Sequence, residues 1–424
     1  MKVLLISHTP ISTQNNMGKT FRSLFSSFDA EELCQFYIYP SYPDDFYCSS
    51  FYRVTEKDLL KHAFPGGRVD ETKIHSGQRL YEKKEDEGFY RSAKNKSAFR
   101  RIARDLLWFF GNWYNGKLKH WILTEQPTHI FLAPGPSAFI YSVCLKIAKD
   151  FDLPIFTYLC DEYYFVKPGK TLLEKIWQRH LKKNIEKVMK NSSHIFAISK
   201  EMKEAYGSHF SVPTSLLMTG SEREEAFSSE RKEVSNFSYF GNIRLGRAKS
   251  LRDIGLALDE INSERKTHLI LNIYTGEKDK TFLSVFDGVK SIRVQGFLSG
   301  DAYEKAMEET NVILHTESFE EEMIDRVRHS VSTKIASALA SGIPLFAYGP
   351  KEVSSMKHLM ENDCALCATK DTELKEKIAL LLDSPDLRKK FVSGALLTAK
   401  TYHNATRNSK MLYDLMQNLR SKQF

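Results

Sequence analysis

The sequence predicts an α/β protein with two Rossmann-like parallel-sheet domains that face a central cleft and a helical C-terminal tail. Two observations carry this prediction. Short strand-like segments rich in β-branched and aromatic residues alternate with amphipathic helical segments, and this pattern starts again near residue 236. In addition, 424 residues are too many for one ordinary core, so two or three domains are expected.

Each half of the chain contains five segments with the composition of β-strands. They are residues 2–7, 35–40, 129–135, 154–160 and 194–199, and then 237–242, 269–276, 291–297, 311–317 and 343–349. Between them, residues 171–190 place apolar side chains at three-to-four spacing, which is typical of an amphipathic helix. Residues 41–90 break the alternation and are predicted to form an irregular insertion.

The alternation also predicts domain boundaries. The first domain should span 1–218, and the polar stretch "TGSEREEAFSSERKEVS" at 219–235 should be a linker. The second domain should then span 236–400. Residues 401–424 are expected to form a C-terminal helix that packs back on the first domain.

Composition excludes several classes of protein. With 42% hydrophobic and 27% charged residues, the chain has the mix of a globular protein in water. The apolar patch at 106–113 is far shorter than the roughly 20 residues of a membrane span. The start "MKVLLISHTP" reads as a first strand rather than a signal peptide, so a cytoplasmic location is expected. Cys364 and Cys367 form a lone C-x-x-C pair, which is a weak metal signal, and no metal site is predicted.

Residues 91–119 combine positive charge with aromatic side chains. Eight basic residues stand against one acid, Asp105, and phenylalanine, tryptophan and tyrosine residues are interleaved with them. A helix with this pattern fits an anionic membrane surface, and it fits ordinary packing on its own domain equally well. A nucleic-acid patch fits less well, so nucleic acid is not expected as a partner.

The segment "SHTPISTQNNMGKTF" at 7–21 looks like the end of a phosphate-binding P-loop. A P-loop needs a glycine five residues before Gly18, and Thr13 stands there instead. ATP binding is therefore not predicted. The segment is better interpreted as the loop between the first strand and the first helix, with Gly18 and Lys19 facing the cleft.

A candidate phosphate site lies in the second half, in "FGNIRLGRAKSL" at 240–251. A glycine turn follows directly after a strand, and Arg244, Arg247 and Lys249 come next. A strand–glycine–helix corner with a nearby guanidinium binds anions, because backbone N–H groups and a bidentate donor converge on them. We expect Arg247 to be the functional base.

A second candidate segment is "HTESFEEEMIDRVRHSVSTKIASALASGIPLFAYGP" at 315–350. A strand ends in an acidic loop whose carboxylates could accept hydrogen bonds from sugar hydroxyls. The sequence "SVSTK" then opens a helix. Ser332 or Thr333 is predicted to cap this helix, and Lys334 adds positive charge in its first turn.

These motifs carry a resemblance. The order of "GNIRLGR", "YTG", "VQGFL", "NVILHTES" and "STKIASALASGIPLFAYGP" resembles the retaining GT-B glycosyltransferases of the family-4 (group 1) type. With "MKVLLISHTP", "FTYLCDEYY" and "HIFAISKEMKEAY", the resemblance covers nearly the whole chain. It implies transfer of a hexose from a UDP- or GDP-sugar, bound by the second domain. The acceptor would be a glycan or lipid-linked molecule bound by the first domain, in bacterial surface polysaccharide synthesis. The enzyme would need no cofactor and could lie on the inner face of the cell membrane.

The resemblance assigns roles to individual residues. Arg247 and Lys334 match the basic pair that neutralises the donor diphosphate, and Asp161 matches an acidic residue facing the cleft. The acceptor side would hold His8, Gly18, Lys19 and Ser137. The nucleotide side would be formed by Gly241, Asn242, Gly276, Ser332, Thr333, Ser337 and Gly342.

The sequence departs from the family pattern at its two glutamates. Alignment on Gly342 puts Ser337 where a ribose-binding glutamate is expected. Glu320 could supply the first glutamate, but the insertion "EEMIDRVRH" stretches the usual spacing. A catalytically inactive GT-B partner that orients an active transferase is therefore the alternative. A GT-B sugar epimerase would need catalytic carboxylates and a histidine across the cleft, and no matching set is found.

Overall fold

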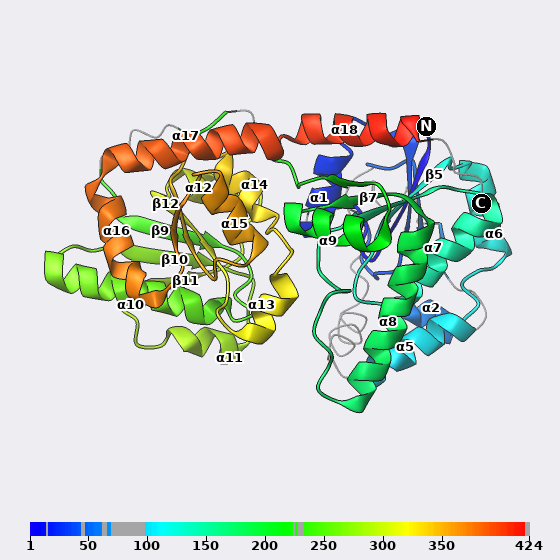
Figure 1. The fold of residues 1–424 in the computed structure, drawn as a ribbon, viewed down its shortest axis with the longest axis horizontal. Helices are drawn as coiled ribbons and strands as arrows, with labels where there is room; N and C mark the ends of the chain where they lie inside the picture. Colours follow the sequence, from blue (N-terminus) through cyan, green and yellow to red (C-terminus); the bar gives the residue numbers. More distant parts are fainter. Residues whose placement is uncertain are drawn as a thin grey trace. The chain divides into compact units, whose positions relative to one another are not determined.

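The computed structural model describes residues 1–13, 16–43, 47–61, 66–68, 98–223, 225–227 and 233–419. It divides into two compact units (Figure 1). The first unit contains residues 1–218 and the C-terminal residues from 406 on, and the second contains residues 219–405. The chain therefore leaves the first unit after Met218 and returns to it at Thr406.

The first unit is built on an eight-stranded sheet with the order β4-β3-β2-β1-β5-β6-β7-β8. Every pair is parallel except β3–β4. All five residues of β1 are buried, as expected for a strand covered on both faces. The strands are β1 Val3–Ser7, β2 Leu33–Tyr37, β3 Ser50–Arg53, β4 Gly67–Arg68, β5 His129–Ala133, β6 Ile155–Leu159, β7 Ser192–Ala197 and β8 Thr214–Leu216.

Helices connect these strands. The helix expected at 171–190 is confirmed as α8, and it starts in a capping box in which Thr171 accepts from the Glu174 amide. Its buried side includes Trp177 and Leu181. The helices are α1 Asn16–Leu24, α2 Glu56–Leu60, α5 Ala98–Phe110, α6 Gly116–Glu125, α7 Ala138–Phe151, α8 Leu172–Asn191, α9 Lys200–Phe210 and α18 Ala405–Asn418, with a short 3₁₀ turn at Ala30–Glu32.

The expectation of an irregular insertion at 41–90 is wrong in part. Strand β3, helix α2 and strand β4 lie in this range and extend the sheet beyond β2. The strand pattern is weak there because β3 and β4 have four and two residues. Residues 44–46, 62–65 and 69–90 lie outside the described residues.

The second unit contains a six-stranded parallel sheet with the order β11-β10-β9-β12-β13-β14. The five strands expected in this half are confirmed, and β14 adds an edge strand that the sequence did not predict. Phe237, Leu251, Ile273 and Phe346 belong to the core around this sheet. The strands are β9 Asn236–Phe240, β10 Ile270–Tyr274, β11 Ile292–Gln295, β12 Val312–Thr316, β13 Leu345–Tyr348 and β14 Leu366–Ala368.

Helices flank this sheet as well. The helix that was expected to open at "SVSTK" is α14, which begins at Lys334 and ends at Leu339. The helices are α10 Arg247–Arg265, α11 Lys280–Leu283, α12 Asp301–Glu308, α13 Glu321–Val327, α14, α15 Ser354–Glu361, α16 Leu374–Asp383 and α17 Pro385–Tyr402, with 3₁₀ turns at Ser284–Phe286 and Asp371–Glu373.

The C-terminal segment contains two helices where one was expected from 401. Helix α17 ends at Tyr402 and α18 starts at Ala405, so the break falls at 403–404. Helix α18 packs on the first unit, where the Ser27 amide donates to Ser409 Oγ at 2.8 Å. The Tyr413 hydroxyl also donates to Glu32 at 3.1 Å. Residues 420–424 lie outside the described residues.

The strand order of each sheet has one point at which the connections reverse direction. In the first unit it lies between β1 and β5, and in the second between β9 and β12. Open parallel sheets bind ligands at the carboxyl ends of the strands beside such a point. His8 follows β1, Gly241 follows β9 and Glu317 follows β12. Across all the described residues, no helix is both long and apolar enough to span a bilayer.

Candidate functional site

The turn between β9 and α10 sets the position of Arg247. The Tyr239 hydroxyl donates to the Asn242 carbonyl at 2.7 Å, and Asn242 Oδ1 accepts from the Arg244 amide at 2.7 Å. Gly246, with φ +76°, then ends the turn in the left-handed region that favours glycine. Asn242, predicted to contact the nucleotide, therefore uses its side-chain oxygen inside the turn.

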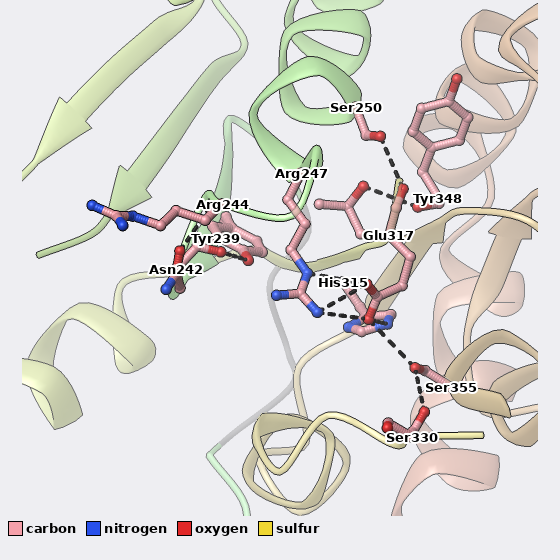
Figure 2. Close-up of polar contacts among 11 residues, drawn as sticks. Tyr239, Asn242, Arg244, Arg247, Ser250, His315, Glu317, Ser330, Tyr348 and Ser355 are labelled. Atoms are coloured by element: carbon pink, nitrogen blue, oxygen red, sulfur yellow. Dashed lines mark hydrogen bonds and ion pairs between the residues drawn. The ribbon is translucent and has the colours of Figure 1, made fainter. Parts of the chain in front are cut away.

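Arg247 is held by a buried carboxylate. Its Nε donates to Glu317 Oε2 and its Nη2 to Oε1, both at 3.1 Å (Figure 2). Glu317 follows β12 and is only 2% exposed. The two parallel bonds fix the plane of the guanidinium. Sequence reasoning placed Glu317 only among the acids of a loop, and its position directly after an apolar strand was the signal available.

Three further side chains surround the Glu317 carboxylate and carbonyl. Ser355 Oγ donates to Oε1 at 3.4 Å, and His315 Nε2 lies 3.5 Å from the same oxygen. Ser250 Oγ, from the first turn of α10, donates to the Glu317 carbonyl at 2.9 Å. Figure 2 shows that these contacts connect the start of α10 with the end of β12. The charged group is thus buried together with its partners, as buried ions must be.

His315 is neutral at physiological pH. The pKa of His315 is lowered to about 4, chiefly by burial; the Glu317 carboxylate acts to raise it, and the positive charges of Arg247 and Lys334 act to lower it. The positive charge at this corner therefore comes from Arg247 and Lys334. In the group of side chains around Arg247, the negative charge that balances these two bases comes from Glu317.

Lys334 reaches the glycine turn from α14. A Cβ built at Gly241 would collide with Lys334 Nζ, so the missing side chain makes room for the ammonium group. The predicted cap is wrong, because Thr333 occupies the N-cap position without a side-chain cap bond. Thr333 has helical backbone angles (φ −59°, ψ −19°), whereas a capping side chain usually stands on extended backbone.

A pocket opens beside this corner and contains three of the predicted residues, Arg247, Ser332 and Lys334. The rest of its wall is largely apolar and comes from β9, β12, α12, α14 and β13. Its other lining residues are Tyr239, Phe240, Tyr303, Met307, Ile313, Leu314, His315, Thr316, Ile335, Ala338 and Leu345. The pocket thus places two bases beside aromatic and aliphatic side chains.

Other residues predicted for the nucleotide do not line this pocket. Gly342, expected on the nucleotide side, packs against the connector between the domains, because a Cβ built there would lie 2.8 Å from Ala226 Cβ. The Phe227 amide also donates to the neighbouring Ser341 carbonyl at 2.8 Å. Gly276 lies against Phe297 instead, and Ser337 lies one turn into α14.

Glu320 lies on the surface at the N-cap position of α13. Its amide donates to Ser318 Oγ at 3.1 Å, and its Oε2 lies 3.5 Å from a Cβ built at Gly246. The carboxylate is therefore next to the turn that carries Arg247. Glu320 is thus exposed beside this turn, whereas Glu317 is buried.

A second polar group lies at the strand ends of the first unit. His8 Nε2 lies 3.2 Å from Ser137 Oγ, and Arg104 Nη1 donates to the same oxygen at 3.1 Å. Ser137 occupies the N-cap position of α7 but makes no side-chain cap bond there. Burial and Arg104 lower the pKa of His8 to about 3, which keeps it neutral. Arg104, which also pairs with Glu56, was not predicted as part of this site.

The remaining predicted residues belong to the first unit. Gly18 lies in α1, where a Cβ would collide with the Ser12 backbone, so close packing requires glycine there. Lys19 is exposed. Asp161 is exposed and accepts from the Tyr163 hydroxyl at 3.2 Å.

The cysteine pair is part of the fold. Cys364 Sγ donates to the Leu359 carbonyl and Cys367 Sγ to the Ala365 carbonyl. Burial raises the pKa of both thiols to about 12. Within the parts of the chain that the structure describes, no group of three or more His, Cys, Asp or Glu residues is arranged to hold a metal ion.

Known structures resemble this arrangement over nearly the whole chain. Sucrose-phosphate synthase from Thermosynechococcus elongatus matches with a TM-score of 0.65 at 12% identity, covering 99% of this chain and 98% of that one. Anabaena HepE, solved with UDP and glucose, matches with 0.65 at 10% identity, covering 99% and 100%. The chain has the GT-B fold.

Two further comparisons concern this GT-B chain. WaaG, a glycosyltransferase involved in lipopolysaccharide biosynthesis, matches with a TM-score of 0.59 at 11% identity, covering 98% of this chain and 100% of that one. Residues 256–414 match a family described as glycosyl transferase-like. The matched part includes Glu317 and Lys334 but starts inside α10, after Arg247. No curated protein matches the sequence.

Proposed function

We propose that the chain is a retaining glycosyltransferase that moves a hexose from a UDP- or GDP-sugar to a glycan or lipid-linked acceptor. The observation that carries this proposal is the convergence of Arg247 and Lys334 beside the glycine turn that follows β9. The glycosyl transferase-like match over residues 256–414 supports it. The role of WaaG in lipopolysaccharide biosynthesis supports a place in bacterial surface polysaccharide synthesis. A location at the inner face of the cell membrane is part of the proposal.

In this proposal the two bases bind the donor diphosphate. Negative charge grows on the leaving nucleoside diphosphate in the transition state, and fixed cations stabilise it without reorganisation. Glu317 holds the guanidinium of Arg247 in one plane, so the cation is already oriented before the donor arrives. Neutral His315 adds no charge that would weaken the pair. HepE in complex with UDP and glucose supports a nucleotide-sugar donor.

The sugar and the acceptor would be bound by other residues. Exposed carboxylates such as Glu320 and Asp161 can accept hydrogen bonds from sugar hydroxyls. His8, Ser137 and Arg104 offer neutral and cationic donors at the strand ends of the first unit. Gly18 and Lys19, in helix α1 after the first strand, are assigned to the same side in this proposal. These residues form the proposed acceptor side.

Calorimetric titration with UDP and GDP tests the donor site. Arg247→Ala and Lys334→Ala should each weaken binding of the preferred nucleotide about tenfold to a hundredfold, because each removes charge-assisted hydrogen bonds. Lys249→Ala is the matched control, since Lys249 is an exposed base in the first turn of the same helix. Unchanged affinity in both site variants would refute the proposed donor site.

Incubation with a panel of UDP- and GDP-sugars tests turnover. Slow hydrolysis of one donor without acceptor is the result expected for a transferase. The alternative, an inactive GT-B partner of another transferase, follows from Ser337 at the expected glutamate position. It would show nucleotide binding without turnover of any donor.

A further inference from the structure

We propose that the first unit binds the surface of an anionic lipid bilayer through a face formed by α5 and the first turns of α8. We call this the α5–α8 face. Its apolar members are all exposed large side chains, from 47% to 79% of their surface. They are Phe99, Leu106, Phe109, Phe110, Leu172, Leu173 and Ile176.

Helix α5 has apolar side chains on two opposite sides. Ala98, Asp105 and Trp108 face inward, and the Trp108 ring stacks on Phe139 with 4.4 Å between centroids. Phe99, Leu106 and Phe110 follow one another at helical spacing on the outward side. A helix on the surface of a protein in water normally presents polar residues there. Within the described residues, the outward stripe of α5 is exposed to solvent, and this favours an apolar partner.

The α5–α8 face differs from the pattern predicted at 91–119. Two aromatic residues of that pattern, Trp108 and Tyr114, are not part of the face, and residues of α8 are added to it. Trp108 is 1% exposed and belongs to the core. The Tyr114 hydroxyl donates to Asp150 at 2.6 Å and stays on the domain. Residues 91–97 lie outside the described residues. The sequence reasoning did not include α8, whose first two turns expose Leu172, Leu173 and Ile176.

Side-chain packing joins the two helices into one face. The Arg101 guanidinium lies over the Trp177 ring at 4.4 Å from its centroid. Figure 1 shows α5 beside the N-terminal half of α8. The exposed apolar residues at the start of α8 therefore continue the apolar stripe of α5.

The exposed charges on the two helices have one sign. Asp105 is buried, Glu174 bonds the Thr171 amide at the start of α8, and Glu186 accepts from Tyr164. The exposed charged residues are all basic: Arg100, Lys175, Arg179, Lys183, Lys187 and Lys190. A bilayer with anionic headgroups complements this combination of rings and bases. A second copy of the chain would bring the same positive charges together, so charge disfavours it as the occupant.

Helix α5 contributes both to the α5–α8 face and to the proposed acceptor side. Arg104 projects from α5 to Ser137, next to His8. If the proposed function holds, a lipid-linked acceptor lying in the bilayer would be presented close to these residues. Membrane binding itself does not depend on that function.

Vesicle flotation of the full-length protein tests the proposal. We expect binding to phosphatidylcholine vesicles containing about 30% phosphatidylglycerol, little binding to pure phosphatidylcholine, and release by about 0.5 M NaCl. Phe99→Ser with Phe110→Ser should lower the partition coefficient about tenfold or more. Lys175→Glu with Arg179→Glu should lower it by a similar factor, because both bases are exposed near the start of α8. Leu397→Ser is the matched control, because Leu397 is 67% exposed on α17 of the second unit.

Three results would overturn the proposal. They are no binding to anionic vesicles, equal binding to neutral vesicles, and a dimer that the Phe99→Ser, Phe110→Ser variant dissociates. Nucleotide affinity and the thermal transition of each variant are measured in parallel. Unchanged values show that a loss of vesicle binding comes from the face and not from misfolding. A protein that binds vesicles but no nucleotide would refute only the proposed function.

Discussion

Glu317 is a buried carboxylate whose charge is balanced by one guanidinium. The pair is stable because Arg247 meets both oxygens, while Ser355 and His315 lie around them. Removing one member of such a pair leaves the other charge without compensation, which costs more than the pair contributes when intact. The stability of the second unit should therefore depend on both residues together.

We predict that Glu317→Ala lowers the free energy of unfolding by about 3 kcal/mol or more. The double variant Glu317→Ala, Arg247→Leu should lose less than the sum of the two single variants, because it leaves no unpaired charge. Urea unfolding followed by fluorescence measures both. Glu320→Ala, at an exposed neighbour, is the control and should change stability by less than about 0.5 kcal/mol. Additive single losses would contradict the coupling.

At the residue scale, the sequence could predict bases but not their partners. Arg247 and Lys334 were found because each follows a recognisable strand or helix signal, and both line the pocket. The pairing of Arg247 with Glu317 could not be read from the sequence, since it depends on β9 and β12 being neighbours in the sheet. The packing of Gly342 against Ala226 depends in the same way on where the connector runs.

At the scale of single elements, the start of helix α10 depends on the backbone conformation of one residue, Gly246. Gly246 has φ +76°, and a Cβ there would lie 2.7 Å from Ser318 Cβ. The glycine thus satisfies two demands, a left-handed conformation and a close approach to the loop after β12. Because Gly246 precedes Arg247 and Ser318 follows Glu317, this close approach brings the two charged side chains together.

We predict that Gly246→Ala destabilises the protein by at least about 1 kcal/mol more than Gly288→Ala does. Gly288 has a similar φ of +82°, but a Cβ there would meet nothing within 4 Å. The comparison therefore separates the backbone cost, which both share, from the collision, which only Gly246 has. Thermal unfolding measures the difference, and nucleotide affinity should fall only in Gly246→Ala. Equal losses would show that the collision is relieved without cost.

The elements that sequence reasoning found differ in kind from those it missed. Central strands such as β1 and β12 are continuous apolar runs because both faces are covered. The missed strands β3, β4, β8 and β14 have two to four residues each and lie toward the sheet edges. Their composition carries little periodic signal, and only pairing with a neighbour defines them.

At the scale of the whole molecule, histidines whose pKa values are lowered by burial link stability to pH. Burial lowers the pKa of His315 and His403 to about 4 and that of His8 to about 3. His403 Nδ1 lies 2.8 Å from the Thr219 carbonyl and must donate to it, so its Nε2 accepts from His358 Nε2 at 2.9 Å. This arrangement requires a neutral His403.

We predict that the protein loses stability between pH 6.5 and 5. The folded pKa values lie below the usual 6.5, so the stabilisation is complete above pH 6.5. In this window the unfolded chain binds protons that the folded chain excludes, which costs about 1.4 kcal/mol per pH unit for each histidine. Urea midpoints measured from pH 7.5 to 5 check this.

His403→Gln is the diagnostic variant for the pH dependence. It removes one titrating group, so its midpoint should fall less steeply with decreasing pH than that of the unmodified protein. A parallel slope would exclude His403 from the effect. A midpoint that rises on acidification would contradict the whole account.

The return of the chain to the first unit has a consequence for biosynthesis. On the ribosome, the residues up to Met218 emerge before the second unit, yet helix α18, which belongs to their domain, emerges after it. The first domain therefore cannot complete its folding until the whole inserted domain has been translated. Asn408 Nδ2 donates to the Met218 carbonyl at 2.8 Å, so departure and return points are adjacent. A short bridge from 218 to 406 should consequently yield a separately expressible N-terminal domain.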